Sequence, residues 1–408
     1  MLDTLIVFTY AHTGLGHLRV TDALVEGLPS EQKYIIFEVP ESSSEFLHRF
    51  SSLHIVARYF LEWLQRGLPE KIFTRVYRNY LKKHAGKLLM QFTSVIKAQN
   101  SQFEKIIIVS THFTLAHQLG AIKKQIEVEL KTEVNLVVQV TDDSPQYLWY
   151  VDTADTIVVP SHETKTELQK YAQNERLTAV KIEVASYPIV PSFSKPLNNE
   201  QISDRQNQYD PTKDNKINIA IPISGAAVGT QFFLHLMEKL HSKSERFVFY
   251  VVCRQAPFTE SFIKEISKRS YIKLFVSESY KEVVELYDHV YLNQVISAEV
   301  TKPSEQAFKA LIHNNSVGGA FLFFAQPVGR QEYDNLDFLK NHGFLSDTSR
   351  HQRALLLPIG SDSSVKIIWE KFSSGVLLDV FNKFQPAEKS DETSDMGVRD
   401  FWKLILKI

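Results

Sequence analysis

Short apolar runs that alternate with helical stretches are the feature that most limits the folds open to this chain. In the first half, runs rich in β-branched residues occupy 5–10, 34–38, 105–110, 134–141 and 156–159. These runs are apolar almost throughout, which is typical of parallel strands that helices cover on both faces of a sheet. The pattern predicts an α/β fold with a doubly wound sheet.

The same alternation occurs a second time after a polar interruption. The stretch 196–215, "PLNNEQISDRQNQYDPTKDN", contains few apolar residues and two prolines. Beyond it, strands are predicted at 217–223, 247–252, 272–276 and 319–325, with helices at 230–242 and 259–269. A chain of 408 residues is also long for one hydrophobic core, so we expect two domains.

These patterns define a predicted domain organisation. A first Rossmann-like domain is expected at 1–197, a linker at 198–215 and a second Rossmann-like domain at 216–384. The acidic, serine-rich segment 385–397 is expected to be flexible. The amphipathic sequence "VRDFWKLILKI" at 398–408 is expected to form a docked C-terminal helix.

Composition excludes several classes of protein. The formal net charge is -1, with 44% apolar and 23% charged residues, which is the balance of a globular protein and not of a disordered or nucleic-acid-coating one. Cys253 is the one cysteine, so no internal disulfide or cysteine-based zinc site is expected, and the setting is expected to be reducing. No apolar stretch approaches the roughly 18 residues of a membrane span, and no export signal is visible. We expect a cytoplasmic protein.

The first strand is followed by "HTGLGHLRVTDAL" at 12–24. Gly14 and Gly16 would let the backbone approach a ligand in a strand-to-helix turn. A dinucleotide fingerprint would need a third glycine where Arg19 stands, which disfavours a nicotinamide cofactor. His17 falls near the first helical turn, where a neutral imidazole that can accept a proton is favoured. The alternative is that His17 only packs in the turn.

Two other loops of the first half follow strands and are rich in polar and aromatic residues. They are "STHFTLAH" at 110–117 and the segment 141–161, which begins "TDDSPQYLW". In open α/β sheets, ligands bind at the carboxyl ends of the strands. The side chains expected to line one cleft are therefore His17, His112, Asp142 and Trp149, although each alone is more often a surface or packing residue.

The second half offers its own candidate site for an anion. "SGAAVGT" at 224–230 is a turn of small residues that opens a helix, where free N–H groups and the helix dipole can hold a phosphate. The alternative is a tight turn with no ligand. In "VVCRQ" at 251–255, Arg254 ends a strand and is placed to meet a diphosphate with two hydrogen bonds.

Two further motifs follow in the second half. "VTKPSEQAFKAL" at 300–311 predicts a helix with Pro303 in its first turn and Ser304 or Glu305 as the cap. The segment 329–345, "GRQEYDNLDFLKNHGFL", carries amides and a carboxylate that can recognise hydroxyl groups. These are Gln331, Glu332 and Asn335.

The order and spacing of these motifs resemble GT-B glycosyltransferases of family 28. That group includes monogalactosyldiacylglycerol synthases, processive diacylglycerol glucosyltransferases and the lipid II N-acetylglucosaminyltransferase. "VVCRQ" is similar to the family's V-V-C-G-R-N, "TKPSEQAF" to T-K-x-G-x-x-T, and "GRQEYDN" to the sugar-contacting G-x-x-E-x-x-N. The "VTDD…W" segment and "VASYPIVPSF" at 184–193 also resemble family motifs, so the likeness spans roughly residues 4–345.

The resemblance implies two Rossmann-like domains that face each other across a cleft. It also implies transfer of a hexose, with inversion, from a nucleotide-diphosphate sugar, expected to be a UDP-sugar, to a lipid or other hydroxyl acceptor. His17, or Asp142 or Asp143, would be the catalytic base, and no metal or cofactor is needed. On the acceptor side it places Gly14, Gly16, His112, Tyr147 and Trp149. On the donor side it places Ser224, Gly225, Ala226, Arg254, Lys302, Ser304, Glu305, Gln331, Glu332 and Asn335.

The chain departs from the family pattern at several of these positions. Ser304 stands where the family has glycine, Ala310 where it has the ribose-binding glutamate, and Tyr147 where it has histidine. Glu305 is a candidate replacement for the missing ribose ligand. Two other functions therefore stay open: a nucleotide-sugar epimerase of GT-B fold, and a non-catalytic relative that binds a sugar, lipid or protein.

Residues 66–88 carry seven lysines and arginines and one acidic residue, Glu70. Helical spacing puts Lys71, Arg75, Arg78 and Lys82 on one stripe. Phe73, Tyr77, Tyr80, Leu81 and Leu88 fall on the opposite side. This pattern predicts an interfacial helix that is attracted to an anionic membrane surface, in keeping with peripheral association on its inner face. The alternative is a core-packed helix with a solvated basic face.

Overall fold

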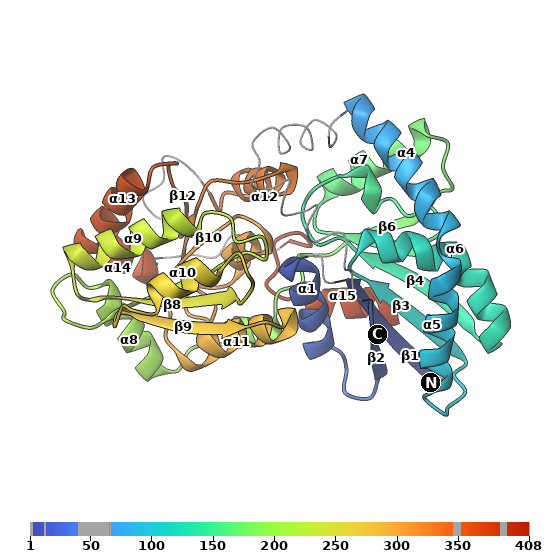
Figure 1. The fold of residues 1–408 in the computed structure, drawn as a ribbon, viewed down its shortest axis with the longest axis horizontal. Coiled ribbons are helices and arrows are strands. Elements are labelled where there is room, and N and C mark those ends of the chain that lie inside the picture. Colours follow the sequence, from blue (N-terminus) through green and yellow to red (C-terminus); the bar gives the residue numbers. More distant parts are fainter. Residues whose placement is uncertain are drawn as a thin grey trace. The chain divides into compact units, whose positions relative to one another are not determined.

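The computed structural model describes residues 3–11, 14–39, 65, 67–345, 352–383 and 390–407. The chain forms two compact units (Figure 1). The first combines Met1–Pro188 with Ser390–Ile408, and the second is Ile189–Lys389. Each unit contains one six-stranded sheet, and all the strand pairs within the two sheets are parallel. The predicted α/β class with two doubly wound domains is confirmed.

The sheet of the first unit reverses its direction of growth at β1. In sheet order its strands are β2 (Lys33–Val39), β1 (Thr4–Ala11), β3 (Lys105–Ser110), β4 (Glu133–Gln139), β5 (Thr156–Val159) and β6 (Lys181–Val184). The chain leaves β1 for β2 on one side and returns to β3 on the other. This reversal creates a topological switch point between the carboxyl ends of β1 and β3, where open α/β sheets bind ligands.

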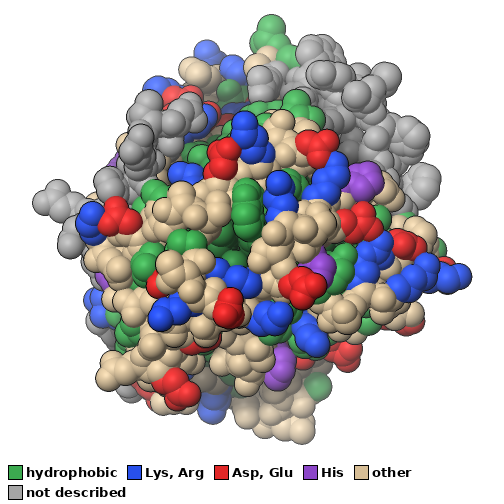
Figure 2. All heavy atoms as spheres, turned by 90° about the vertical axis from the view of Figure 1, so that its left-hand side faces the viewer, with side chains coloured by type: hydrophobic (Ala, Val, Ile, Leu, Met, Phe, Trp, Pro, Cys, Tyr) green, Lys and Arg blue, Asp and Glu red, His purple; other side chains and the backbone are tan. Residues whose placement is uncertain are grey.

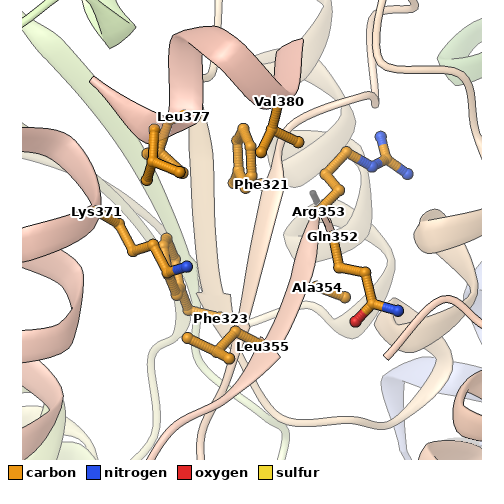
Figure 3. Close-up of a pocket in the computed structure, with 10 residues that line it drawn as sticks. Phe321, Phe323, Gln352, Arg353, Ala354, Leu355, Lys371, Leu377 and Val380 are labelled. Atoms are coloured by element: carbon orange, nitrogen blue, oxygen red, sulfur yellow. The ribbon is translucent and has the colours of Figure 1, made fainter. Parts of the chain in front are cut away.

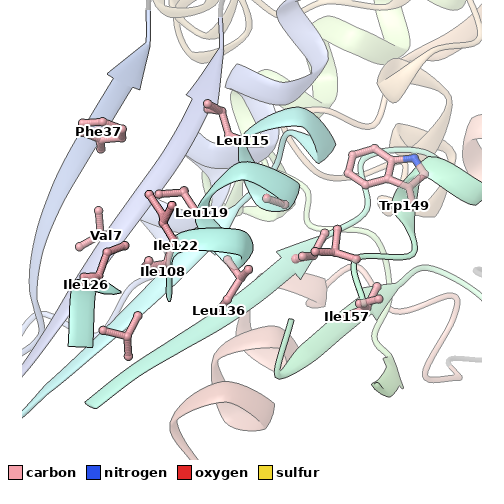
Figure 4. Close-up of a cluster of buried hydrophobic side chains, with 14 of the residues drawn as sticks. Val7, Phe37, Ile108, Leu115, Leu119, Ile122, Ile126, Leu136, Trp149 and Ile157 are labelled. Carbon is pink, nitrogen blue, oxygen red and sulfur yellow. The ribbon is translucent and has the colours of Figure 1, made fainter. Parts of the chain in front are cut away.

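Helices cover both faces of this sheet. Val7 lies in a core with Ile108 and with Leu119 of the long helix that follows β3 (Figure 4). The next residue, Phe8, meets the ring of Trp402 edge-on at 5.9 Å between centroids, because successive strand side chains alternate between faces. The helices are α1 (Leu15–Glu26), α4 (Gly67–Lys83), α5 (Gly86–Lys97), α6 (Phe113–Leu130), α7 (His162–Asn174) and α15 (Gly397–Leu406), with the short 3₁₀ turn η1 (Tyr147–Trp149).

The C-terminal helix α15 belongs to the first unit although the second unit precedes it in the chain. Trp402 is buried and donates its indole N–H to the Leu24 carbonyl at 2.9 Å. Gly397 is the first residue of the helix and packs directly against backbone. An added Cβ would lie 2.3 Å from the carbonyl oxygens of Ser186 and Tyr187. Glycine is therefore required where α15 docks.

The sheet of the second unit repeats the reversal. In sheet order its strands are β12 (Ala354–Leu356), β11 (Phe321–Phe324), β10 (Ala298–Thr301), β7 (Ile217–Pro222), β8 (Phe247–Arg254) and β9 (Ile272–Ser277). Its switch point lies between the carboxyl ends of β7 and β10. The helical elements are η2 (Pro191–Ser194), α8 (Asn199–Tyr209), α9 (Thr230–Lys243), α10 (Glu260–Ile266), α11 (Tyr280–Asn293), η3 (Glu305–Leu311), α12 (Arg330–Asn341), α13 (Ser361–Ser373) and α14 (Val376–Lys383).

Alternating residues of β7 explain how the second core is built. Ile219 and Ile221 pack in one cluster with Leu236 of α9 and Ile368 of α13. On the face of the second unit that Figure 2 shows, basic and acidic side chains are interspersed and apolar ones lie in small groups. That mixture is typical of a solvated surface.

Several segments differ from their sequence-based descriptions. The stretch 198–215 contains helix α8, which begins with a capping box between Asn198 and Gln201. The segment 300–311 forms the end of β10 and the 3₁₀ turn η3 instead of one helix. Residues 385–389 lie outside the described residues, whereas Ser394 accepts a hydrogen bond from Ser186 at 2.5 Å through its carbonyl. No helix within the described ranges combines the length and hydropathy that a bilayer crossing requires.

Candidate functional site

His17 lies in the first turn of α1, directly beyond the carboxyl end of β1. Gly14 precedes the helix and Gly16 is its second residue, while residues 12 and 13 lie outside the described ranges. A Cβ added at Gly14 would meet no atom of the described residues within 4 Å. The switch point of the first sheet therefore carries a histidine and, among the described residues, an uncrowded backbone.

A hydrogen bond fixes the tautomer of His17. Its Nδ1 lies 2.6 Å from the carbonyl oxygen of Thr111, the residue after β3, and 3.3 Å from the Thr141 hydroxyl. A carbonyl oxygen only accepts, so we assign the proton to Nδ1, which donates it to Thr111. Nε2 then carries the lone pair, and this is the nitrogen that can take a proton from a ligand.

Two threonines hold the backbone of His17 in place. The hydroxyls of Thr21 and Thr111 donate to the His17 carbonyl at 2.9 and 3.1 Å, and the two hydroxyl oxygens lie 2.9 Å apart. Both threonines are buried. Neither was predicted from the sequence, although Thr21 stands one helical turn after His17, where its hydroxyl can reach back.

Aromatic rings surround one side of the imidazole. His112 meets the His17 ring edge-on at 4.8 Å between centroids, and Trp149 lies at 6.2 Å. Phe113 stacks on His112 and meets Trp149 edge-on. Burial, and then the neighbouring His17, hold the pKa of His112 well below its ordinary value. His112 therefore acts as a neutral wall, and we name His17, Thr111, His112, Phe113 and Trp149 the His17 cluster.

The two predicted aspartates have different surroundings. Asp143 is buried and accepts hydrogen bonds from Ser161 at 2.6 Å and Thr164 at 2.7 Å, both at the start of α7. Its carboxylate thus secures the N-terminus of that helix. Asp142 is half-buried next to Thr141, which leaves it as the member of the pair with greater access to a ligand.

Tyr147 has a packing role in η1. Its ring stacks on Tyr171 of α7 with centroids 4.0 Å apart, and its backbone N–H donates to Glu70 at 2.8 Å. The structure thus places Tyr147 two residues before Trp149 but gives its ring a partner on α7. The assignment of Tyr147 to the acceptor side stays a prediction.

The glycine-containing loop after β7 turns sharply before α9. Ala227 and Gly229 both adopt left-handed backbone conformations, with φ of 53° and 86°. The Ala227 N–H donates to the Ser224 carbonyl at 2.8 Å, which closes a turn over Gly225 and Ala226. A non-glycine residue in this conformation is uncommon and is often found at functional sites.

Arg254 ends β8 and stacks on an aromatic ring. Its guanidinium carbon lies 4.1 Å from the ring centroid of Tyr280, the first residue of α11, and 5.8 Å from that of Phe258. A Cβ added at Gly225 would lie 3.7 Å from the same Tyr280 ring. Tyr280 therefore joins the loop after β7 to Arg254, and we name Gly225, Arg254 and Tyr280 the Arg254 cluster. Tyr280 was not predicted, although it follows a strand and a serine N-cap.

The loop after β10 is held by internal hydrogen bonds. The Lys302 ammonium donates to the Gln326 carbonyl, and Asn335, which is fully buried, donates to the Pro303 carbonyl at 3.1 Å. Glu332 accepts from the Val328 N–H at the start of α12. These three predicted donor residues thus shape the loops that follow β10 and β11. Three other predicted donor residues are half-buried: Ser304, Glu305 and Gln331.

A buried ionic network lies beneath that loop. Glu299 of β10 pairs with Lys309 of η3, and the hydroxyls of Tyr287 and Tyr291 from α11 donate to the same carboxylate. All four side chains are buried. Burial and the Glu299 carboxylate raise the pKa of Tyr291 well above its ordinary value. The network joins β10, η3 and α11, so it fixes the turn that bears Ser304 and Glu305.

A small pocket of the second unit lies apart from the predicted residues. Phe321 and Phe323 of β11, Ala354 and Leu355 of β12, and Leu377 of α14 line it (Figure 3). Arg353 also lines it; this side chain is buried and donates to the Lys309 carbonyl at 2.6 Å, and burial lowers its pKa to about 10. The lining combines apolar side chains with Gln352, Arg353 and Lys371, and it includes none of the motif residues.

No set of three or more His, Cys, Asp or Glu side chains arranged to hold a metal ion occurs within the described ranges.

Comparisons with solved structures support the fold. The chain resembles the S. aureus MnaA–UDP co-structure, with a TM-score of 0.55, 11% identity, and coverage of 100% of this chain and 97% of that one. It also resembles the UDP-GlcNAc 2-epimerase from Neisseria meningitidis bound to UDP-GlcNAc, with a TM-score of 0.50, 10% identity, and coverage of 99% and 100%. The protein has a GT-B-like fold.

Sequence comparisons add no family assignment. No protein-family model matches the chain, and the search of curated proteins gave no match. At 9–11% identity, these structural likenesses show a shared fold and leave membership of family 28 as a prediction.

Proposed function

We propose that this protein is a nucleotide-sugar-dependent hexosyltransferase of the GT-B type, related to family 28, with a UDP-sugar as donor. The observation that carries the proposal is the 2.6 Å contact between Nδ1 of His17 and the Thr111 carbonyl oxygen. This Nδ1 donates to the Thr111 carbonyl, so Nε2 offers a lone pair at the switch point of the first sheet. A base in this position suits an acceptor hydroxyl that must lose its proton as it attacks.

The proposed reaction is a single displacement with inversion. The acceptor oxygen forms a bond to the anomeric carbon, its proton passes to Nε2 of His17, and the bond from that carbon to the diphosphate breaks. The nucleoside diphosphate leaves with the electron pair of that bond. The guanidinium of Arg254 and the backbone N–H groups of the 225–230 turn other than those of Ala227 and Val228 would stabilise its charge. No metal or cofactor enters this scheme.

We propose further that the acceptor is a lipid hydroxyl held at the cytoplasmic face of an anionic membrane. The support is the basic and apolar composition of residues 66–88, most of which form α4. A lipid acceptor would be reached by a peripheral protein that binds the membrane surface reversibly.

A second candidate function is nucleotide-sugar epimerisation. It is favoured by the likeness to a UDP-GlcNAc 2-epimerase over the full length of both chains. This reaction needs no acceptor. Incubation with UDP-GlcNAc alone separates the two functions: formation of an epimer detected by proton NMR would favour the epimerase and contradict the transferase.

The first experiment is nucleotide binding by calorimetry and thermal shift, with UDP, GDP, dTDP, ADP and their sugars. We expect stabilisation by UDP and its sugars. Absence of binding by all of these ligands would favour the alternative of a non-catalytic binding protein, in line with the buried Ala310 in place of a ribose-binding glutamate.

The catalytic role of His17 is tested by His17→Gln. Removal of a general base is expected to lower turnover by about 10²–10⁴-fold while UDP affinity is retained. The matched control is His162→Gln, because His162 is exposed at the start of α7 and pairs with Asp391. Full turnover in His17→Gln would exclude this histidine as the base.

A further inference from the structure

Helix α4 has its polar residues inside and its apolar residues outside. Glu70, Thr74 and Arg78 face the interior of the first unit and are each less than a tenth exposed. Leu81 is the one large apolar side chain that the helix buries. A surface helix of a globular protein normally has the opposite arrangement. The sequence pattern did not predict this arrangement. It put Arg78 on a basic stripe and Phe73 and Tyr80 on an opposite apolar one, whereas the structure has Arg78 inside and both aromatic residues outside.

The exposed residues of α4 form one continuous stripe. Leu68, Ile72, Val76 and Tyr80 follow one another at intervals of four, and their exposed fractions are 72%, 64%, 64% and 55%. Phe73 extends the stripe with 40% exposure. Spacing of four places these side chains on one face of the helix. We name these five residues the outer face of α4.

Basic residues occur beside the outer face on α4 and at the start of α5. Lys71, Lys83 and Lys87 have no carboxylate partner in the part of the chain that the structure describes, whereas Arg75 and Lys82 pair with Glu175 and Asp152. From 67 to 97 the sequence contains one acidic residue, Glu70, and it is buried. The outer face therefore combines exposed apolar groups with positive charge that α4 and α5 leave uncompensated.

Aromatic rings run along one border of the outer face. Phe73 stacks on Tyr77 at 5.5 Å between centroids, Tyr77 on Tyr80 at 6.4 Å, and Tyr80 lies 4.2 Å from His84. Aromatic side chains with a polar tip are favoured at the boundary between lipid headgroups and hydrocarbon. This border is consistent with a helix that lies in the plane of that boundary.

We propose that the outer face of α4 is the surface by which this protein rests on an anionic lipid bilayer. Leu68, Ile72 and Val76 enter the boundary between headgroups and acyl chains, and the lysines contact anionic headgroups. A second copy of the chain is disfavoured as the occupant. A two-fold contact through this face would bring the same uncompensated lysines together.

The inner face of α4 is joined to the elements that carry the His17 cluster. Glu70 accepts the backbone N–H of Tyr147 in η1, and the Tyr77 hydroxyl lies 3.4 Å from that of Thr114 in α6. A bilayer on the outer face would therefore contact the unit that contains His17. In this respect the inference rests on the proposed lipid acceptor.

The test is cosedimentation of the full chain with vesicles of phosphatidylcholine, alone or mixed with phosphatidylserine. We expect binding to the mixed vesicles that weakens with salt. The combined variant Leu68→Gln, Ile72→Gln and Val76→Gln should lower the partition coefficient by at least about tenfold, since binding scales with buried apolar area. Lys83→Glu with Lys87→Glu should remove the preference for phosphatidylserine.

The matched controls lie on α6 of the same unit. Val128→Gln changes an apolar residue that is 79% exposed, and Lys124→Glu changes an exposed lysine. Both controls should bind vesicles as the parent chain does. All substituted residues are exposed, so thermal unfolding should be nearly unchanged.

Two results would overturn the proposal. One is equal partition of the parent chain and the glutamine variant. The other is conversion of a dimer to a monomer by that variant, seen in light scattering, without a change in vesicle binding. Vesicle binding is measured without nucleotide, so its failure is distinguishable from failure of UDP binding, which tests the proposed function.

Discussion

At the scale of the residue, two buried histidines should give the protein a defined response to acid. Burial lowers the pKa of His112 well below its ordinary value, and burial lowers that of His117 to about 4. The His117 Nε2 also donates to the Leu148 carbonyl at 3.0 Å. Both imidazoles are therefore neutral in the folded protein at physiological pH.

The unfolded chain binds protons on these histidines near pH 6.5, whereas the folded chain does not. Stability is therefore fully present above about pH 6.5 and falls as the pH drops, by up to about 1.4 kcal/mol per pH unit for each histidine. For His117 the loss ends near its folded pKa of about 4. Imidazole carbon signals in NMR should show both rings neutral at about pH 5.5. Titration of either ring near pH 6.5 would contradict this.

Tyr280 is expected to position Arg254 for a diphosphate. Its ring lies 4.1 Å below the guanidinium, and such a contact is worth about 0.5–2 kcal/mol. Tyr280→Ala should weaken UDP binding by about tenfold in calorimetry, and Tyr280→Phe should restore it because the ring suffices. Tyr333→Ala on α12 is the control, since Tyr333 is 39% exposed. Equal weakening in the Phe and Ala variants would show that the hydroxyl matters instead.

At the scale of the element, the Glu299–Lys309 pair determines the conformation after β10. Lys309→Met would leave a buried carboxylate without its cation, which is expected to cost about 3–5 kcal/mol. Calorimetry should show a lower transition temperature, and adding Glu299→Gln should recover part of it. The control is Lys170→Met, which breaks an exposed pair with Glu167 and should cost at most about 1 kcal/mol. A small effect of Lys309→Met would mean that the tyrosine hydroxyls suffice.

The same element shows what the sequence could and could not predict. Long β-branched runs such as 105–110 form strands as predicted, because their apolar side chains can be buried without a specific polar partner elsewhere in the chain. β10 escaped prediction because a buried Glu299 interrupts its apolar run, and its counterion lies ten residues away. At the switch point of the first sheet, loop positions indicated His17 and His112. The contacts of Thr111 and Thr141 with His17 could not be predicted, because they join chain segments 94 and 124 residues apart.

Helix α4 marks a similar limit. Helical spacing put Arg78 on a basic stripe and Leu81 on an opposite apolar one, but it could not show which side chains face the core. The structure buries Arg78 and Leu81 together and exposes Ile72 and Val76. Only tertiary contacts, such as that between Glu70 and the backbone of η1, determine this orientation.

At the scale of the whole molecule, the first unit is made from two separate parts of the chain. Removal of 390–408 should destabilise it, because Phe8 and the Leu24 carbonyl lose Trp402. Trp402→Ala alone is expected to cost about 3–5 kcal/mol. Calorimetry should show a lower transition for the first unit, with UDP binding by the second unit as the control. An unchanged transition would show that α15 is dispensable.

The discontinuity also bears on how the protein is made. During translation the ribosome completes β1 to β6 and then all of the second unit before it reaches Trp402. Until then the surface of Phe8 and α1 that Trp402 covers is exposed, and a chaperone can bind this apolar surface of the nascent chain. Emergence of Gly397–Leu406 is thus the step that completes the first unit, so maturation of its sheet waits until the second unit has been translated.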